Sequence, residues 1–281
     1  MGKIYVSPIK IQGIKTKIVP FIKENIWLED YVWIEPFMGS GIVGFNLAKE
    51  KAIFADTNPY IINFFNDIKN GIITAEKVRL FLEVEGKKFE ELDDKYYYEV
   101  RERFNTYHNS YDFLLLNRSC FNGLIRFNKK GNFNTPYGHK PKRFSKAYIT
   151  KIVNQISYVE EKIKNNDWIF VCQSFEETIK MAKEIKNAII YVDPPYLGRN
   201  TDYYDGWEEN KEIQLCNLLK DSHINFILST WHSNQYRKNE YIEKIWNWCE
   251  IKTFEHFYHI GAKENNRNSI LEALLIQKAN E

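Results

Sequence analysis

A short polar motif, Asp193-Pro194-Pro195-Tyr196, directly follows the apolar run 188–192 and contains groups suited to methylating a planar amine. The lone pair of an exocyclic nucleobase amine is delocalised into the ring, so the nitrogen attacks only when acceptors draw on its N–H bonds. Asp193 offers a carboxylate, Pro194 aims a carbonyl from a fixed φ, and Tyr196 can stack on the base. The motif predicts a catalytic loop, although a Pro-Pro pair can also simply end a core strand.

A second chemical motif is the turn Glu35-Pro36-Phe37-Met38-Gly39-Ser40-Gly41, between an apolar segment and a helical pattern. Its glycines allow the backbone to approach a ligand closely and place helix N–H groups beside it. Asp56 ends the next apolar segment, where an acid can accept hydrogen bonds from both hydroxyls of a ribose. Because the turn, Asp56 and Asp193 all follow predicted parallel strands, we expect them to share one ligand crevice.

The elements that must position these groups alternate along the chain. A helix over 42–50 between strands 31–34 and 52–55 forms a βαβ unit. Later strands are predicted at 168–172, 188–192, 225–230, 251–259 and 269–277, and helices at 176–186 and 211–220. Because no helix separates the last two strands, they should form an antiparallel hairpin at one edge of the sheet.

The middle of the chain lacks strand signals. Its pattern is helical over 58–95 and 96–108, and a further helix is predicted near 146–164. Two extended stretches around the turn 128–132 predict a β-hairpin. The predicted fold class is therefore an α/β sheet interrupted by a helical and β-hairpin module. The predicted division gives one domain made of residues 1–57 and 160–281, and an inserted domain made of residues 58–159.

Composition limits the class of protein. The 281 residues are 44% hydrophobic and 16% aromatic, enough for one large core or a core and a subdomain. No stretch approaches the roughly 18 uninterrupted apolar residues of a membrane span, so we expect a cytoplasmic protein with no membrane contact. The four cysteines are widely spaced without a C-x-x-C pair, so neither a disulfide framework nor a metal site is expected.

The net charge of +2 conceals a strongly basic region. Residues 113–159 contain nine Lys and Arg and no Asp or Glu. A solvated basic face normally carries interspersed acids, whereas a polyanion-binding surface concentrates one sign of charge. We therefore expect nucleic-acid contact in this region, with a solvated basic face as the alternative.

In type and order these motifs resemble those of the α-group, Dam-like (D12 class) DNA adenine-N6 methyltransferases. The resemblance implies a Rossmann-like S-adenosylmethionine-dependent methyltransferase sheet, with 58–159 as the target-recognition domain. It covers nearly the whole chain. The matching stretches are similar to that family's Lys-Trp-x-Gly-Gly-Lys element, cofactor loop, approach to the DNA-reading hairpin and catalytic loop, namely residues 10–15, 37–41, 117–126 and 193–196.

By this resemblance the methyl donor is S-adenosylmethionine, and Asp193, Pro194 and Tyr196 are catalytic. Ile11 stands where the family has Trp, which changes the packing on the cofactor. Ser174 stands where many relatives have Asp before Phe, and a serine hydrogen-bonds with less charge assistance, so we expect weaker binding without loss of activity. The cofactor residues that the resemblance implies are Ile11, Lys15, Glu35, Phe37, Gly39, Ser40, Gly41, Asp56, Ser174, Phe175 and Asp193.

The expected partner is double-stranded DNA, from which the target adenine must be extruded. Phosphate contacts, which position DNA without reading its sequence, suit Lys140, Lys142, Arg143 and Lys146. Arg126 suits a guanine edge and Asn128 an adenine edge.

Another side chain must fill the gap left by the extruded base. Phe121, Asn122 and Tyr137 are the candidates, although an aromatic residue in a hairpin is as often core as wedge. The polar turn 265–268 either contacts DNA or is solvated. The predicted DNA contacts also include Arg118 and Lys130.

The leading hypothesis is a site-specific DNA methyltransferase acting on adenine N6 by base flipping, within a restriction-modification system that pairs it with a cognate endonuclease. We expect it to act as a monomer, because one transfer needs one active site. The alternatives are methylation of an RNA base, methylation of cytosine N4, and a catalytically inactive DNA-binding protein of the same fold.

Overall fold

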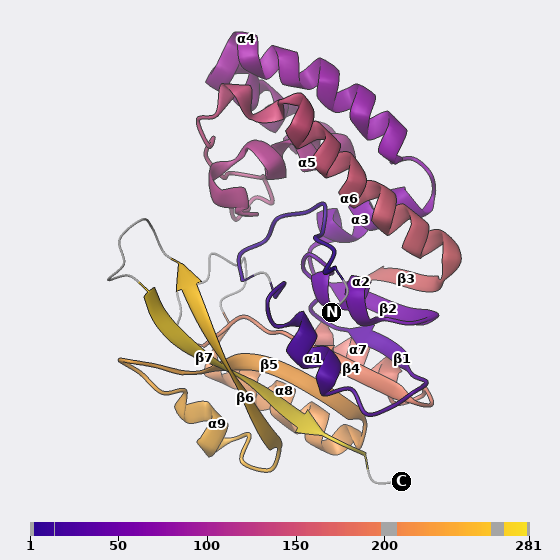
Figure 1. Ribbon diagram of the computed structural model, residues 1–281, viewed down its shortest axis with the longest axis vertical. Coiled ribbons are helices and arrows are strands. Elements are labelled where there is room, and N and C mark those ends of the chain that lie inside the picture. The colour runs from indigo at the N-terminus through magenta and orange to yellow at the C-terminus, as the bar shows by residue number, and fades with distance from the viewer. Residues whose placement is uncertain (1–2, 14, 198–206, 260–266, 280–281) are drawn as a thin grey trace.

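A seven-stranded sheet is the centre of the computed structural model (Figure 1), which describes residues 3–13, 15–197, 207–259 and 267–279. Its strand order is β3-β2-β1-β4-β5-β7-β6. The strands are β1 (Val32–Glu35), β2 (Lys51–Asp56), β3 (Asp167–Cys172), β4 (Ala188–Val192), β5 (Asn225–Asn234), β6 (Glu250–His259) and β7 (Arg267–Gln277). The helices are α1 (Val19–Glu24), α2 (Ile42–Leu47), α3 (Pro59–Lys69), α4 (Ala75–Tyr107), α5 (Ser110–Ser119), α6 (Lys146–Asn165), α7 (Phe175–Ala182), α8 (Glu209–Ser222) and α9 (Glu240–Lys244). Two short 3₁₀ segments are η1 (Phe121–Gly123) and η2 (Pro141–Phe144).

Five neighbouring strands, in the order β3-β2-β1-β4-β5, are parallel. Their buried residues lie on both faces of the sheet. Every residue of β4 is buried. Ile189 and Tyr191 join one apolar cluster, which includes residues of α1, α2, α3 and α6. Ile190 and Val192 join the other, which includes residues of α7, α8 and α9. This two-sided burial explains the continuous apolar run before Asp193 and confirms the predicted α/β class.

The antiparallel edge is confirmed, with one feature that the sequence did not show. β7 pairs antiparallel with both β5 and β6, so the last strand lies between two earlier ones. This order brings residues of β7 beside the end of β4, across β5.

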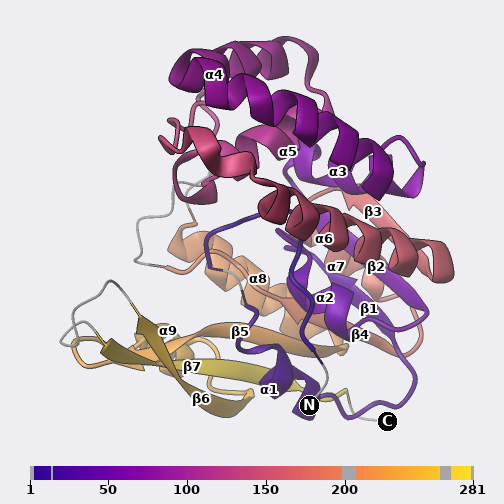
Figure 2. The ribbon, with the colours of Figure 1, turned by 45° about the horizontal axis from the view of Figure 1, so that its top comes forward.

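The segment between β2 and β3 forms a helical layer beyond one end of the sheet, as Figures 1 and 2 both show. Within α4, Asp93 has non-helical backbone angles, so the element is two helices joined at a kink. Contacts between Glu85 and both Tyr96 and Arg103 show that the second half folds back on the first. The predicted boundary at residue 159 falls within α6, and the chain re-enters the sheet only at Asp167.

The β-hairpin predicted in this layer is present in part, because its two arms are joined by isolated antiparallel bridges and not by a regular ladder. Within it the described chain makes only isolated bridges, Cys120 with Tyr137 and Phe127 with Phe133, and begins with η1. The turn is held by Asn128, whose Oδ1 accepts hydrogen bonds from the backbone N–H groups of residues 130 and 132 at 2.9 and 3.1 Å. These side-chain bonds add to backbone bonds between the arms, from Asn128 N–H to Asn132 O at 2.9 Å and from Asn134 N–H to Arg126 O at 3.0 Å.

Three findings concern membrane spans, metal sites and disulfides. Among the described residues, no helix combines the length and apolarity needed to cross a membrane. Within the same ranges, no group of three or more His, Cys, Asp or Glu residues could hold a metal ion. The four cysteines are unbonded to one another.

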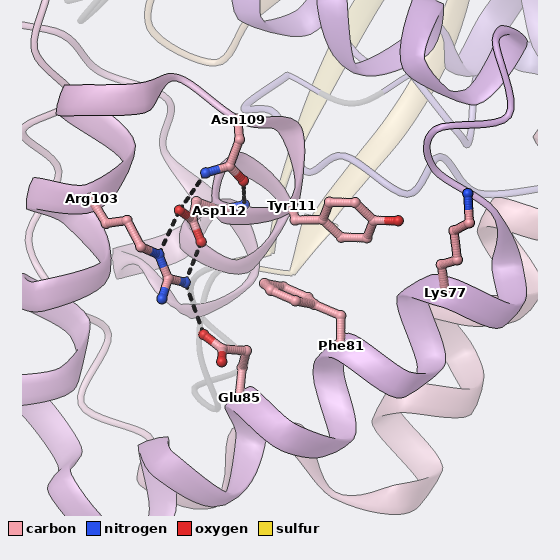
Figure 3. A pocket seen from close by; sticks show the side chains of 7 residues that line it. All are labelled: Lys77, Phe81, Glu85, Arg103, Asn109, Tyr111 and Asp112. Atoms are coloured by element: carbon pink, nitrogen blue, oxygen red, sulfur yellow. Dashed lines mark hydrogen bonds and ion pairs between the residues drawn. The ribbon is translucent and has the colours of Figure 1, made fainter.

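A pocket of about 310 Å³ lies between α4 and α5, away from the predicted site residues. Figure 3 shows Arg103 on its wall, paired with Glu85 at 2.9 Å and with Asp112. Both carboxylates are buried. Burial alone would raise the pKa of Glu85, but hydrogen bonds from Lys88, Tyr96 and Arg103 outweigh it and lower that pKa. The pocket's charged groups thus satisfy one another and hold α4 against α5.

We expect Arg103→Ala to lower the free energy of unfolding by about 3 kcal/mol at pH 7, because it leaves two buried carboxylates without their shared cation. The lowered pKa of Glu85 means that its contribution is present above about pH 4.5 and is lost as pH falls through the folded pKa. The deficit should therefore shrink in acid. Urea unfolding measures it, with the exposed Arg79→Ala as control, for which we expect less than about 0.5 kcal/mol. Equal effects of the two substitutions would contradict this account.

Candidate active site

The loop after β4 places Asp193 between two partners from distant parts of the chain. Its Oδ1 lies 3.0 Å from Lys15 Nζ, and Ser229 Oγ on β5 donates a hydrogen bond to the same oxygen at 3.1 Å. Tyr191 Oη lies 2.8 Å from Ser229 Oγ, which extends the network into the sheet. The Asp193 side chain remains 22% exposed. With both described contacts on Oδ1, Oδ2 is available to a substrate donor.

Burial and charge act in opposite directions on this ion pair. Burial raises the pKa of Asp193, and the adjacent Lys15 ammonium opposes that rise. Burial also disfavours the charged form of Lys15, but Asp193, with weaker contributions from other anionic groups including Glu272, outweighs it and raises the pKa of Lys15. Lys15 is therefore a fixed cation that favours the carboxylate form of Asp193.

Tyr196 is held beside the same lysine. Its hydroxyl donates to Glu272 Oε2 on β7 at 3.1 Å, and Lys15 Nζ lies 4.8 Å from the centre of its ring. Pro194 is buried between Asp193 and Tyr196 in sequence. The ring of Tyr196 is thus anchored at its polar end, and the neighbouring carboxylate and carbonyl belong to the same short loop.

The turn after β1 is built to approach a ligand. Gly39 and Gly41 have φ of 47° and 70°, in the left-handed region that favours glycine. A Cβ at Gly41 would lie 2.6 Å from the Phe45 ring. Gly39 N–H donates to Asp56 Oδ2 at 2.9 Å, which joins the turn to the end of β2. Ser40 is buried within the turn, and the Ile11 side chain would contact a Cβ at Gly39.

Asp56 accepts hydrogen bonds from backbone N–H groups on both sides. Besides Gly39, the N–H of Asn58 donates to its Oδ1 at 2.8 Å. Burial raises the pKa of Asp56, and these backbone donors oppose the rise. The carboxylate therefore lies at the carboxyl end of β2, next to the glycine turn.

Glu35 is the most enclosed of the predicted cofactor residues, at 2% exposure. Its Oε2 accepts hydrogen bonds from Trp33 Nε1 and Gly44 N–H, both at 3.1 Å. Burial raises its pKa to about 8. The carboxyl group therefore supports the turn and the start of α2 from beneath.

Glu35 should make stability depend on pH. Its folded pKa of about 8 exceeds its unfolded value near 4.5, so the stability it contributes is full below pH 4.5 and is lost as pH rises through 8. Glu35→Gln should remove this dependence of the free energy of unfolding on pH. The dependence amounts to about 1.4 kcal/mol for each unit of difference between the folded and unfolded pKa. Thermal or urea unfolding from pH 5 to 9 measures it, with the exposed Glu50→Gln as control. A slope unchanged by Glu35→Gln would refute this assignment.

Phe37 and Phe175 meet beside the turn. Their rings stack with centroids 5.4 Å apart and an interplanar angle of 22°. Ser174 is the N-cap of α7, where its hydroxyl accepts from Glu177 N–H at 3.3 Å and Glu177 returns a bond to the Ser174 backbone. The serine therefore already serves its own helix through a capping box.

The comparison that decides the family covers most of the chain. A model of the D12 class N6 adenine-specific DNA methyltransferases matches residues 12–260. The chain belongs to this family. The turn 35–41 and the loop 193–196 both lie within the matched span.

Individual members show how far the similarity extends. A DNA adenine methylase of Serratia marcescens is 36% identical over 67% of this chain and 66% of its own length. One from Haemophilus influenzae is 32% identical over 86% of this chain and 83% of its own. The Type II methyltransferase M.FokI of Planomicrobium okeanokoites is 26% identical over 98% of this chain and 43% of its own. The match thus spans just under two thirds of the Serratia relative and less than half of M.FokI.

In this D12 class chain, the N-terminal segment is fastened to the helical layer as well as to the catalytic loop. Lys10 and Asn117 exchange two hydrogen bonds, each 2.8 Å long, between the Lys10 backbone and the Asn117 amide. Arg118 is 2% exposed and donates to Pro8 O at 2.7 Å and to Gln155 Oε1 at 2.5 Å. The segment that leads to Lys15 is therefore anchored to α5 by these hydrogen bonds. Ile14, part of the matched N-terminal motif, lies outside the described residues.

The predicted DNA contacts divide by exposure. Phe121 is 53% exposed, and Asn122 is exposed with a left-handed φ of 53°. Tyr137 is 1% exposed and stacks on Tyr97 with centroids 5.0 Å apart. Arg118 and Tyr137 are thus interior side chains that hold this layer together. Exposed with Phe121 and Asn122 are Lys130, Lys140 and Lys142.

The remaining predicted contacts are half-buried and bonded within the chain. Arg126 Nε donates to Asn134 Oδ1 at 2.9 Å, and Asn128 holds its own turn. Arg143 donates to Arg118 O at 3.0 Å and to Tyr148 Oη at 3.1 Å. Residues 265 and 266 of the polar turn lie outside the described ranges.

Ser229 and Glu272 are site residues that sequence reasoning missed. Each is a buried polar residue next to an apolar run of its strand, 226–228 before Ser229 and 273–276 after Glu272. That pattern was a usable signal, since a buried polar group needs a hydrogen-bonding partner. Which partner it has depends on strand order.

Proposed function

We propose that this chain transfers a methyl group from S-adenosylmethionine to N6 of adenine in a short double-stranded DNA sequence. The observation that carries the proposal is the position of Asp193, paired with Lys15 and Ser229 and followed by an anchored Tyr196. Membership of the D12 class supports the reaction and the base. Bound cofactor would supply an electrophilic methyl group.

The residues beside the glycine turn fit such a cofactor. The open left-handed turn at Gly39 and Gly41 leaves room for close backbone approach. Asp56 would accept hydrogen bonds from ribose hydroxyls in place of its present backbone donors. Phe37 and Phe175 offer a flat apolar surface to the adenine. Glu35 would act from beneath by keeping the turn in shape.

The chain's own residues would make the amine reactive. Asp193 Oδ2 and the Pro194 carbonyl would accept hydrogen bonds from the two N–H groups, so that the nitrogen lone pair can attack. As positive charge develops on that nitrogen, the fixed carboxylate stabilises it without reorganisation. Lys15 holds Asp193 in place and in its ionised form, and the surplus proton leaves to water.

Tyr196 would receive the extruded base. Its ring is fixed through Glu272, which gives a planar base a surface against which to stack. The role of this residue is therefore positioning of the acceptor opposite the methyl donor.

The DNA-facing surface that we propose is the exposed part of the basic region, residues 113–159. Phe121 or Asn122 would fill the gap left by the base, and the lysines at 130, 140 and 142 would contact phosphates. Arg126 and Asn128 would have to exchange their internal bonds for base edges. Arg118 and Tyr137 are left out because they are buried.

The setting follows from the substrate and from the relatives. A DNA substrate supports a cytoplasmic location, and the name of the M.FokI relative, a Type II methyltransferase, supports a restriction-modification system with a cognate endonuclease. Action as a monomer is part of the proposal, because one transfer event needs one active site. Residues 1–57 and 160–281 would form the catalytic domain, and residues 58–159 the target-recognition domain.

Transfer of tritium from methyl-labelled S-adenosylmethionine tests the proposal. We expect label in unmethylated duplex DNA and none in RNA of the same sequence. Label in RNA alone would overturn the DNA assignment. Absence of label in both, with DNA binding intact, would indicate an inactive binding protein.

A further inference from the structure

An aromatic cluster beside the cofactor turn contains a residue that neither the motifs nor the proposed mechanism uses. Trp207 meets Phe37 edge-on, with centroids 5.5 Å apart at 82°, and meets Phe175 at 5.6 Å and 60°. Phe37 follows β1, Phe175 begins α7 after β3, and Trp207 immediately precedes α8. The three rings therefore meet where the carboxyl ends of parallel strands and the starts of helices share one edge.

Glu212 fixes the orientation of this indole. Its Oε2 accepts from Trp207 Nε1 at 2.6 Å, and its Oε1 accepts from Trp246 Nε1 at 2.9 Å. Both Glu212 and Trp246 are buried. Because an indole N–H occupies each carboxyl oxygen, Trp207 is tied to the interior of α8 and presents its other edge to the phenyl rings.

The cluster is not sealed as a core would be. Trp207 and Phe37 are half-buried, whereas Trp33 and Tyr191 in the sheet interior are fully buried. Ser174, at the same place, has its hydroxyl engaged by the N–H of residue 177. The side chains of this cluster therefore offer a ligand mainly aromatic surface, because the Ser174 hydroxyl is already engaged.

We propose that Trp207, oriented by Glu212, is a third aromatic wall of the pocket for the adenine of S-adenosylmethionine. The inference rests on the proposed function, which places that adenine beside Phe37 and Phe175. Stacking and edge contacts with an aromatic ring then supply affinity where Ser174 lacks the charge of an acid. In the sequence, Trp207 lies only eleven residues beyond Tyr196 of the catalytic loop.

Calorimetric binding to the full chain tests the wall. The two probes are S-adenosylmethionine and 5′-methylthioadenosine, which keeps the adenosine and lacks the amino acid. We expect Trp207→Ala to weaken both by about tenfold and to raise KM for the cofactor with little change in kcat at saturation. The control is Trp248→Phe, because that indole donates to Ile245 O at 3.0 Å and touches neither phenyl ring. We expect the control to bind both probes as the parent chain does.

A second variant keeps the test decisive should Trp207→Ala unfold. Trp207→Phe retains a ring, so we expect cofactor affinity within about threefold. We also expect the cofactor to change the tryptophan fluorescence of the parent chain and this change to be lost in Trp207→Phe. Unaltered affinity in a folded Trp207→Ala, or an unaltered fluorescence change in Trp207→Phe, would overturn the wall. Loss of affinity for S-adenosylmethionine with full affinity for methylthioadenosine would place Trp207 at the other end of the cofactor and also overturn it. A parent chain that binds neither probe would instead contradict the proposed function.

Discussion

Asp193→Ala is expected to lower kcat for methyl transfer by about 10³-fold while leaving affinity for DNA within about threefold. The substitution removes the charged acceptor aimed at the amine, and the loss of one such preorganised group typically costs 10²–10³-fold in rate. In our proposal the DNA contacts come from the basic region 113–159, which the substitution leaves unchanged. Single-turnover transfer of labelled methyl measures the rate, and a mobility shift measures binding.

Asp193→Asn separates charge from shape at the same position. It keeps one carbonyl acceptor but leaves Lys15 without its closest anion, so we expect a loss of about 10²-fold, between those of the parent chain and Asp193→Ala. Melting temperatures of both variants show whether folding accounts for the effect. Retained transfer in a folded Asp193→Ala would remove Asp193 from the mechanism.

Lys15→Met is expected to reduce the rate about tenfold to a hundredfold at pH 7 and to move the acid limb of the pH–rate profile upward. Burial already raises the pKa of Asp193, and Lys15 opposes the rise more strongly than the hydrogen bond from Ser229 does. Without the ammonium, the folded pKa of Asp193 rises further, so the carboxylate needed as acceptor forms only at higher pH. The deficit should therefore narrow between pH 7 and pH 9.

Two further substitutions distinguish this role from a structural one. Lys15→Arg keeps a cation and should return the acid limb toward its original pH. Lys23→Met removes an exposed lysine from α1 and should leave the profile unchanged. A uniform loss at all pH values in Lys15→Met would show that Lys15 does not act through the ionisation of Asp193.

The positions of the catalytic loop and the cofactor turn were predictable because each directly follows a strand. Parallel strands bring their carboxyl ends to one edge, which puts Asp193 at the same edge as Gly39 and Asp56, and the last two are hydrogen-bonded. The partners of Asp193 and Tyr196 were not predictable in the same way. Ser229 and Glu272 are brought to the loop by the order β4-β5-β7, which depends on pairing between distant strands.

The basic region, residues 113–159, shows where prediction from local sequence patterns fails. Residues 121–137 have the alternation and turn of a hairpin, yet the Asn128 side chain accepts from the backbone N–H groups of residues 130 and 132, and Tyr137 packs into the interior. Charge alone likewise did not separate buried Arg118 from exposed Lys140. Side-chain competition for backbone groups and burial are set by tertiary contacts, which composition does not encode.

Identification of the methylated nucleoside is the most direct test of the central claim. Unmethylated duplex DNA is incubated with the chain and S-adenosylmethionine, digested to nucleosides and resolved by mass spectrometry. The account predicts N6-methyldeoxyadenosine, absent when Asp193→Ala replaces the parent chain. N4-methyldeoxycytidine would contradict the assigned base, and the absence of any methylated nucleoside would contradict the assigned activity.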